Sequence, residues 1–273
     1  MRHTAYFFRY HFLSLLLIGF FSLSLSGCDD ESAEADGEGT VAVNLIHRAG
    51  NNLLQGDADD YKLGLGNVDY TAEKLKYYLS SFELTNADNQ RVSFPTVALV
   101  DALNGTVLLN DSGDPIQSLR IDLTNVPKGT YTKVSFVIGL DEVDNQTGAL
   151  PNLTDHLNMA WPEPMGGGYH YMKFEGRFTD AQGESQTFAT HTGRLSNAIK
   201  TEDYYIPVTL TLDEPITVTG REAQSITVAH DADEWFANPN NTALQDYPRM
   251  IMGNHDAQEI FKANGATVFY LPQ

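Results

Sequence analysis

The stretch YHYMKFEGRFTDAQGESQTFATH, residues 169–191, is the clearest β signal in this chain. Apolar and polar side chains alternate on both sides of Asp180–Gly183, a segment of turn-forming residues. Alternation with a period of two is typical of half-buried strands, and short polar segments with glycine reverse the chain between them. The stretch therefore predicts a β-hairpin with strands at Tyr169–Phe178 and Gln186–His191.

The pleat of the first of these strands sorts its side chains onto two faces. His170, Met172 and Phe174 are expected on one face, and Lys173 on the other. The turn brings the second strand back along the first, so His191 is expected near His170. The sequence leaves the register of the two strands open.

Similar alternation recurs from about residue 40 to residue 219. Turn residues separate the segments, as in Asn86–Asn89, Asn104-Gly105 and Pro127–Gly129. Short strands at this spacing predict an all-β fold, an antiparallel β-sandwich. The further strands are expected at Val41–His47, Leu75–Thr85, Val97–Asp101, Leu119–Leu123, Tyr131–Ile138, Tyr205–Leu212 and Ile216–Thr219.

One or two short helices are expected near the C-terminus. The segment Asp231–Ala237 can form a helix with Asp231 as its N-cap. The segment Asp256–Ala263 precedes Asn264-Gly265, which is a typical helix stop.

The first 27 residues are typical of an export signal. They carry two arginines and no acidic residue, and their apolar run is too short to remain across a bilayer. The run ends in LSGC, residues 25–28, which resembles the bacterial lipobox. We therefore expect a signal peptide over residues 1–27 and lipidation of Cys28. An acidic flexible tether is expected over residues 28–39, and one domain over residues 40–273.

A lipidated chain of this kind would be extracytoplasmic, anchored to the inner or the outer membrane and facing the periplasm or the cell surface. Its formal charge of -19 makes nucleic acid an unsuitable partner. Because Cys28 is the only cysteine, the domain has neither a disulfide nor a thiolate ligand for a metal.

Methionine and histidine cluster in two short segments. Three methionines lie between residues 159 and 172, together with Trp161 and His170, and two more precede His255. Thioether and imidazole groups together suit a soft metal such as Cu(I). A methionine beside Phe174 on a strand face is also typical core filling. The spacing alone leaves both interpretations of Met172 open.

Several longer stretches resemble the MbnP-like family, the methanobactin-associated periplasmic copper-binding proteins. The central similarity is carried by MAWPEPMGGGYHYMKFEGRF, residues 159–178, followed by FATHTGRL, residues 188–195. The remaining similarity is carried by EKLKYYLSSFELTN, VPKGTYTKVSFVIGLDEVDNQTGAL and MIMGNHDAQEIFKANGATVF, residues 73–86, 126–150 and 250–269.

The resemblance implies a β-sandwich with a copper site, Cu(I) or Cu(II), made by histidines and an oxidised tryptophan. In that family the tryptophan becomes a kynurenine through a partner di-haem cytochrome c peroxidase-like (MbnH-like) protein. By the same resemblance Trp161 is the candidate for oxidation, and His170 and His191 are the motif histidines. His47 is a third candidate ligand and His255 a fourth. The chain departs from better known members, which carry a cysteine pair after the second motif histidine.

The position of Trp161 is expected to be a loop. Pro162 and Pro164 follow it directly, and three glycines, residues 166–168, come next. A haem protein could reach a tryptophan placed on such a loop.

Two other function classes compete with copper binding. The stretch GDADDYKLGLGNVDY, residues 56–70, gathers carboxylates in an expected loop, as calcium would require. A calcium-stabilised adhesion or carbohydrate-binding module is therefore the main alternative. Catalysis is disfavoured because nucleophile elbows, zinc-protease motifs and phosphate-binding loops are missing from the sequence. We therefore expect a binding protein rather than an enzyme.

Overall fold

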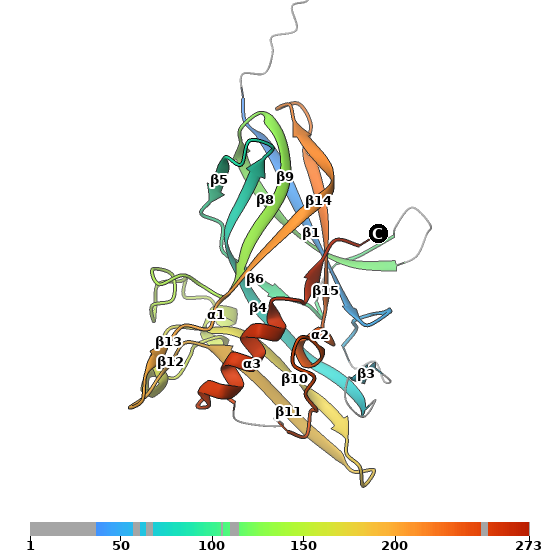
Figure 1. Cartoon of the computed structure of the whole chain (residues 1–273), viewed down its shortest axis with the longest axis vertical. Coiled ribbons are helices and arrows are strands. Elements are labelled where there is room, and N and C mark those ends of the chain that lie inside the picture. The colour runs from blue at the N-terminus through green and yellow to red at the C-terminus, as the bar shows by residue number, and fades with distance from the viewer. Residues whose placement is uncertain are drawn as a thin grey trace, which may run out of the picture. The chain divides into compact units, whose positions relative to one another are not determined.

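The computed structural model describes residues 37–56, 61–63, 68–104, 106–109, 115–246 and 251–272. The expected signal peptide, Cys28 and most of the expected tether lie outside these ranges. Strands predominate among the described residues (Figure 1). None of the helices found there combines the length and the apolar character that a membrane crossing needs.

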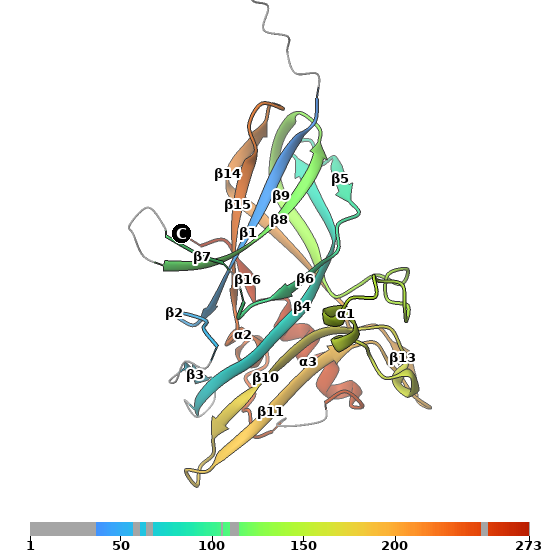
Figure 2. The ribbon, with the colours of Figure 1, turned by 180° about the vertical axis from the view of Figure 1, so that it is seen from behind.

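The first sheet runs, within the described residues, in the order β16–β15–β1–β8–β7, and β2 also pairs with β1. Figure 2 shows β1 between β8 and β15. β1 and β15 are parallel, with His47 opposite His230, whereas the other pairs are antiparallel. The strands are β1 (Gly39–Ala49), β2 (Asn52–Leu53), β7 (Thr106–Leu109), β8 (Pro115–Val126), β15 (Gln224–Asp231) and β16 (Phe269–Tyr270).

The second sheet runs in the order β11–β10–β4–β9–β14, and three short strands also pair with the long β4. All its pairs in the described ranges are antiparallel. Its strands are β3 (Tyr61–Leu63), β4 (Val68–Asn86), β5 (Arg91–Phe94), β6 (Ala98–Asp101), β9 (Gly129–Ile138), β10 (His170–Thr179), β11 (Ser185–Gly193) and β14 (Ile206–Val218). A separate ribbon joins β12 (Leu195–Ser196) to β13 (Thr201–Glu202).

The main core lies between the two sheets. Alternating residues of β9, Val134, Phe136 and Ile138, are buried and pack with Leu45 of β1 in one hydrophobic cluster. Full burial of such a side chain contributes about 1.5–3 kcal/mol. The packing confirms the expected all-β sandwich. A smaller cluster contains Tyr78, Leu140, Met159, Tyr169 and Tyr171.

The helices are short. They are α1 (Thr154–Asn158), the 3-10 helix η1 (Glu163–Met165), α2 (Glu234–Ala237) and α3 (His255–Gly265). The expected C-terminal helix corresponds to α3, which starts one residue earlier because the Asn254 side chain accepts from the backbone N–H of Ala257.

The expected cap of the other helix is wrong. Asp231 is the last residue of β15, and α2 begins at Glu234. The carboxylate of Asp231 accepts instead from the backbone N–H groups of Gly50 and Asp233, both at 3.0 Å. It therefore fixes the turn between strand and helix rather than the helix end.

Three further expectations need correction. The segments Tyr205–Leu212 and Ile216–Thr219 form one strand, β14, with an irregularity in its pairing to β9. The expected acidic loop contains paired strands at Tyr61–Leu63 and at the start of β4. Most of its carboxylates fall outside the described residues. The parallel strand β15 was not expected, because its polar–apolar alternation covers only residues 225–228.

Candidate metal centre

Trp161, His170 and His191 lie together beside the β10–β11 hairpin. The ring centroids of Trp161 and His170 are 4.8 Å apart, and those of His170 and His191 are 4.9 Å apart, both edge to face. They come from the loop before β10, the first residue of β10, and β11. The structure thus brings together the three side chains on which the metal hypothesis depends.

A β-bulge explains how His170 reaches His191. The register of β10 against β11 shifts by one residue between His170 and Met172. Such a shift turns the residues before it to the other face of the strand. His191 lies opposite Lys173, so these two side chains share a face. Because of the shift, His170 lies on the same face as they do.

The expected common face of His170 and Met172 is therefore wrong. Met172 is completely buried and belongs to the main core together with Phe174. The sequence-based expectation assumed a regular strand without a bulge, and the bulge in β10 makes that assumption fail. The structure favours core filling as the role of Met172.

The carbonyl oxygen of Met159 holds the ring of His170 in one tautomer. It lies 3.0 Å from Nδ1 of His170 and 2.7 Å from its backbone nitrogen. Because a carbonyl can only accept, we assign the ring proton to Nδ1, which leaves the lone pair on Nε2. Burial lowers the pKa of His170 to about 3, so the ring is neutral.

Glu175 holds His191 in the opposite tautomer. Its Oε1 lies 2.9 Å from Nε2 of His191, and its Oε2 lies 2.7 Å from Nζ of Lys74. The hydrogen bond from His191 and then the contact with Lys74 lower the pKa of Glu175 to about 2, so it is a carboxylate. Because a carboxylate can only accept, Nε2 of His191 carries a proton, and Nδ1 is the ring nitrogen left for a metal.

Trp161 lies in a loop, as expected, but its indole is only 2 % exposed. The loop is closed by the bond from the Trp161 backbone N–H to the Gly168 carbonyl at 2.9 Å. The indole also packs on Gly193, where a Cβ atom would lie 2.8 Å from Cε3 of Trp161. A haem protein therefore cannot touch the ring face directly, which corrects the expectation drawn from the loop position.

In each of the two imidazole rings, one nitrogen is hydrogen-bonded to a fixed acceptor and the other nitrogen is left for a metal. Histidines that bind metals typically donate their other ring N–H group to a carbonyl or a carboxylate. Imidazole nitrogens suit copper and zinc. The described residues contain no group of three or more His, Cys, Asp or Glu placed to hold a metal ion.

His47 lies in the main core, in a different group of rings. Its Nε2 is 2.6 Å from the hydroxyl of Tyr77, and its ring lies 5.4 Å from that of His230. Trp235 donates to Nε2 of His230 at 3.1 Å, which places the His230 proton on Nδ1. Burial lowers the pKa of His47 to about 3. Among the described contacts, the ring of His47 meets neither His170 nor His191.

His255 lies at the start of α3. Its Nδ1 is 2.6 Å from the hydroxyl of Tyr204, and its Nε2 is buried with no hydrogen-bond partner among the described residues. Among the described residues its ring contacts that of Tyr204 and not the rings of the candidate centre. The structure thus does not bring His255 to the other candidate ligands.

α3 reaches the centre through Gln258 instead. Its Nε2 donates to the carbonyl of His191 at 2.9 Å, and its Oε1 accepts from the backbone N–H of Gly193 at 3.3 Å. Sequence reasoning missed Gln258, since nothing in its neighbourhood marks it. It also missed Glu175, although the two-residue spacing from Lys173 places it on the face of His191.

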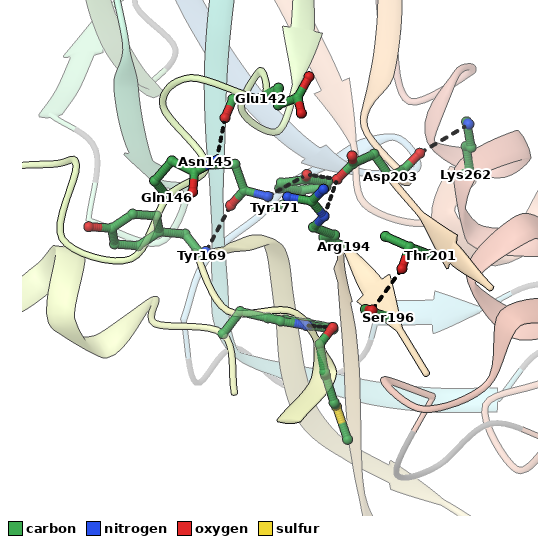
Figure 3. Close-up of polar contacts among 12 residues, drawn as sticks. Glu142, Asn145, Gln146, Tyr169, Tyr171, Arg194, Ser196, Thr201, Asp203 and Lys262 are labelled. Atoms are coloured by element: carbon green, nitrogen blue, oxygen red, sulfur yellow. Dashed lines mark hydrogen bonds and ion pairs between the residues drawn. The ribbon is translucent and has the colours of Figure 1, made fainter. Parts of the chain in front are cut away.

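A polar network holds the loop after β9 against the start of β10 (Figure 3). Asn145 donates to the hydroxyl of Tyr171 at 2.7 Å, and that hydroxyl donates to Asp203 at 2.8 Å. Arg194 lies 3.7 Å from the same carboxylate. Asn145 also accepts from the backbone N–H of Tyr169 at 2.9 Å. These bonds fix the chain segment that leads into His170.

Comparisons with known proteins find one family and one solved structure that the chain resembles. A family model described as MbnP matches residues 38–253. A solved structure, "MbnP from Methylosinus trichosporium", is 18 % identical, with a TM-score of 0.49 over 74 % of this chain and 79 % of that one. No curated protein matches the sequence significantly.

Proposed function

Because the chain belongs to the MbnP family, whose model covers residues 38–253, we propose that it is a lipid-anchored, extracytoplasmic copper-binding protein and not an enzyme. Its copper site would combine His170, His191 and an oxidised Trp161. Copper, Cu(I) or Cu(II), would be the ligand rather than a catalytic metal. The lipid on Cys28 would anchor the chain to the inner or the outer membrane, facing the periplasm or the cell surface.

One observation carries this proposal. Nε2 of His170 and Nδ1 of His191 are the ring nitrogens opposite those held by Met159 and Glu175, and the two rings meet edge to face beside the indole of Trp161. Two neutral nitrogen ligands stabilise Cu(I) or Cu(II) without an added negative charge. A preorganised pair also loses little conformational entropy when a metal binds.

The third donor would come from oxidation of Trp161 to kynurenine by a di-haem peroxidase. The peroxidase would remove four electrons from the indole, and two water molecules would supply the oxygen atoms at C2 and at C3 as the bond between these carbons breaks. The four electrons and the four released protons reduce two peroxide molecules to four molecules of water. Water then hydrolyses the N-formyl group to formate, which leaves an aniline nitrogen and a ketone. Both groups can donate to a metal, whereas an intact indole offers only its N–H.

The test is expression of the lipid-free domain with and without a di-haem peroxidase and peroxide. The proposal expects a mass gain of about 4 Da on the peptide with Trp161, together with about one bound copper per chain. Trp161→Phe should abolish the mass change, and His170→Ala and His191→Ala should lower copper binding. Asp88→Ala, a change in the exposed turn between β4 and β5, is the control. A metal-free, unmodified wild type would overturn the proposal.

A further inference from the structure

The segment that contains Trp161 has an unusual charge. We call residues 141–169, between β9 and β10, the cover. It contains five acidic residues and neither lysine nor arginine. Its acidic residues are Asp141, Glu142, Asp144, Asp155 and Glu163. Only Asp155 forms an ion pair with a described cation, at 3.2 Å from Nζ of Lys76. The cover is thus a negatively charged surface with little neutralisation.

The cover also exposes large apolar side chains. Val143 is 77 % exposed, Leu153 58 % and Leu157 60 %. Leu153 is the N-cap of α1, and Leu157 follows it by four residues, about one helical turn. The two side chains therefore lie on the same side of α1. Half of the large hydrophobic residues that the described chain exposes most strongly lie in this segment. Apolar groups rimmed by charge are typical of interaction surfaces.

The cover is held in a fixed shape. Thr147 donates to Glu163 at 2.6 Å and accepts from the backbone N–H of Gly168 at 2.8 Å, which joins its first part to its last. His156 of α1 lies 2.7 Å from the hydroxyl of Tyr78 on β4. The bonds of Asn145 add a third attachment (Figure 3). These contacts leave the exposed apolar side chains presented to solvent rather than folded inward.

We propose that the cover is the docking face for the protein that oxidises Trp161, and that this partner meets it with lysine and arginine side chains around an apolar centre. The inference rests on the proposed function. Since the indole is 2 % exposed while Ala160 and Pro162 beside it are exposed, an oxidant must act across the cover. Complementary charge speeds the encounter of redox partners, whose interfaces are often below roughly 1,200 Å². The same negative charge repels an anionic lipid surface.

The experiment compares three variants with wild type, using the organism's di-haem peroxidase as the probe. Glu142→Lys with Asp144→Lys reverses charge in the cover, and Val143→Ser with Leu157→Ser removes apolar area. Asp213→Lys with Glu214→Lys is the control, because these exposed residues of β14 lie near the start of β9, whereas the cover follows its end. Thermal unfolding checks that each variant is folded.

Charge reversal should lower the rate of Trp161 oxidation about tenfold at low salt. It should also make that rate depend less on salt concentration. The apolar variant should slow it at all salt concentrations, and the control should match wild type. Unchanged rates in both cover variants, or an equal loss in the control, would overturn the docking face.

Binding of the peroxidase without peroxide, measured by calorimetry, separates this inference from the proposed function. If wild type binds through the cover but Trp161 is never oxidised, the docking face stands and the copper proposal loses its third donor. If Trp161 is oxidised and the cover variants bind like wild type, the docking face is wrong.

Discussion

The rings of His170 and His191 meet edge to face, 4.9 Å apart, and each is held from behind by a different acceptor. A backbone carbonyl fixes the first ring, and the carboxylate of Glu175 fixes the second. Because the two acceptors select opposite tautomers, the free nitrogens are Nε2 in one ring and Nδ1 in the other. The geometry of the pair therefore depends on residues that would not touch the metal.

Replacing Glu175 with glutamine tests this dependence. Glutamine keeps an acceptor oxygen but loses the charge, so the preference of His191 for a proton on Nε2 should weaken. Nitrogen-15 NMR of the metal-free protein should show a mixture of tautomers, and copper affinity should fall about tenfold to a hundredfold. Glu184→Gln, in the exposed turn of the same hairpin, should change neither. A single unchanged tautomer in the Glu175 variant would contradict the assignment.

Replacing Gly193 with alanine should displace the indole. The new Cβ atom would lie 2.8 Å from Cε3 of Trp161, which is closer than packed carbon atoms approach. Overpacking of this kind lowers the free energy of unfolding by about 1–3 kcal/mol, measurable by urea denaturation. Gly253→Ala is the control, because its nearest atom, Cε of Met165, is 4.0 Å away. Equal stability of the two variants would show that the loop adapts freely.

Replacing Asp233 with asparagine should stabilise the protein at high pH. Burial, and then repulsion from Asp231, raise the pKa of Asp233 from 3.8 to about 7, although the hydrogen bond from Tyr70 opposes the shift. An acid with a raised pKa favours the folded state at low pH, and this contribution is lost as the pH rises through about 7.

The Asp233 variant should therefore exceed wild type by about 1–2 kcal/mol above about pH 8, with the difference shrinking toward about pH 4. Urea denaturation across this range is the measurement. Asp88→Asn, in an exposed turn, should show no such trend. A constant difference at every pH would argue against titration of Asp233.

Replacing Tyr77 with phenylalanine should weaken the core without affecting the metal centre. The change leaves Nε2 of His47 buried with no partner, since the Tyr77 hydroxyl is its hydrogen-bond partner at 2.6 Å. An unpaired buried group costs about 1–3 kcal/mol in the free energy of unfolding. Copper content should stay at the wild-type level, because His47 contacts Tyr77 and His230. Loss of copper in this variant would indicate that His47 takes part in copper binding. Tyr205→Phe, at an exposed position, is the control.

The hairpin and the proximity of His170 and His191 could be predicted from the sequence, because alternation and turn chemistry are local properties. The sequence also predicted the loop around Trp161 from its prolines and glycines. It failed at Met172, since a bulge depends on how β10 pairs with both neighbouring strands. The shift at Glu175–Gly176 has a sequence signal in its glycine, whereas the shift between His170 and Met172 has none in the residues of β10.

Tertiary contacts account for the rest of the difference. Gln258 reaches β11 only because α3 packs there, and no spacing rule relates residue 258 to residues 191 and 193. The cover could be read as acidic from the sequence. Its shape could not, because it depends on Asn145 and Thr147 bonding to distant backbone groups.

The parallel pairing of β1 with β15 has a consequence for the order of folding. Val41 pairs with Gln224, and Arg48 pairs with Asp231. Contacts between such distant residues form slowly, because a long loop must close first. In a chain that crossed a membrane N-terminus first, one edge of β1 could pair with β8 early, whereas its other edge would stay unpaired until the last fifth of the chain emerged.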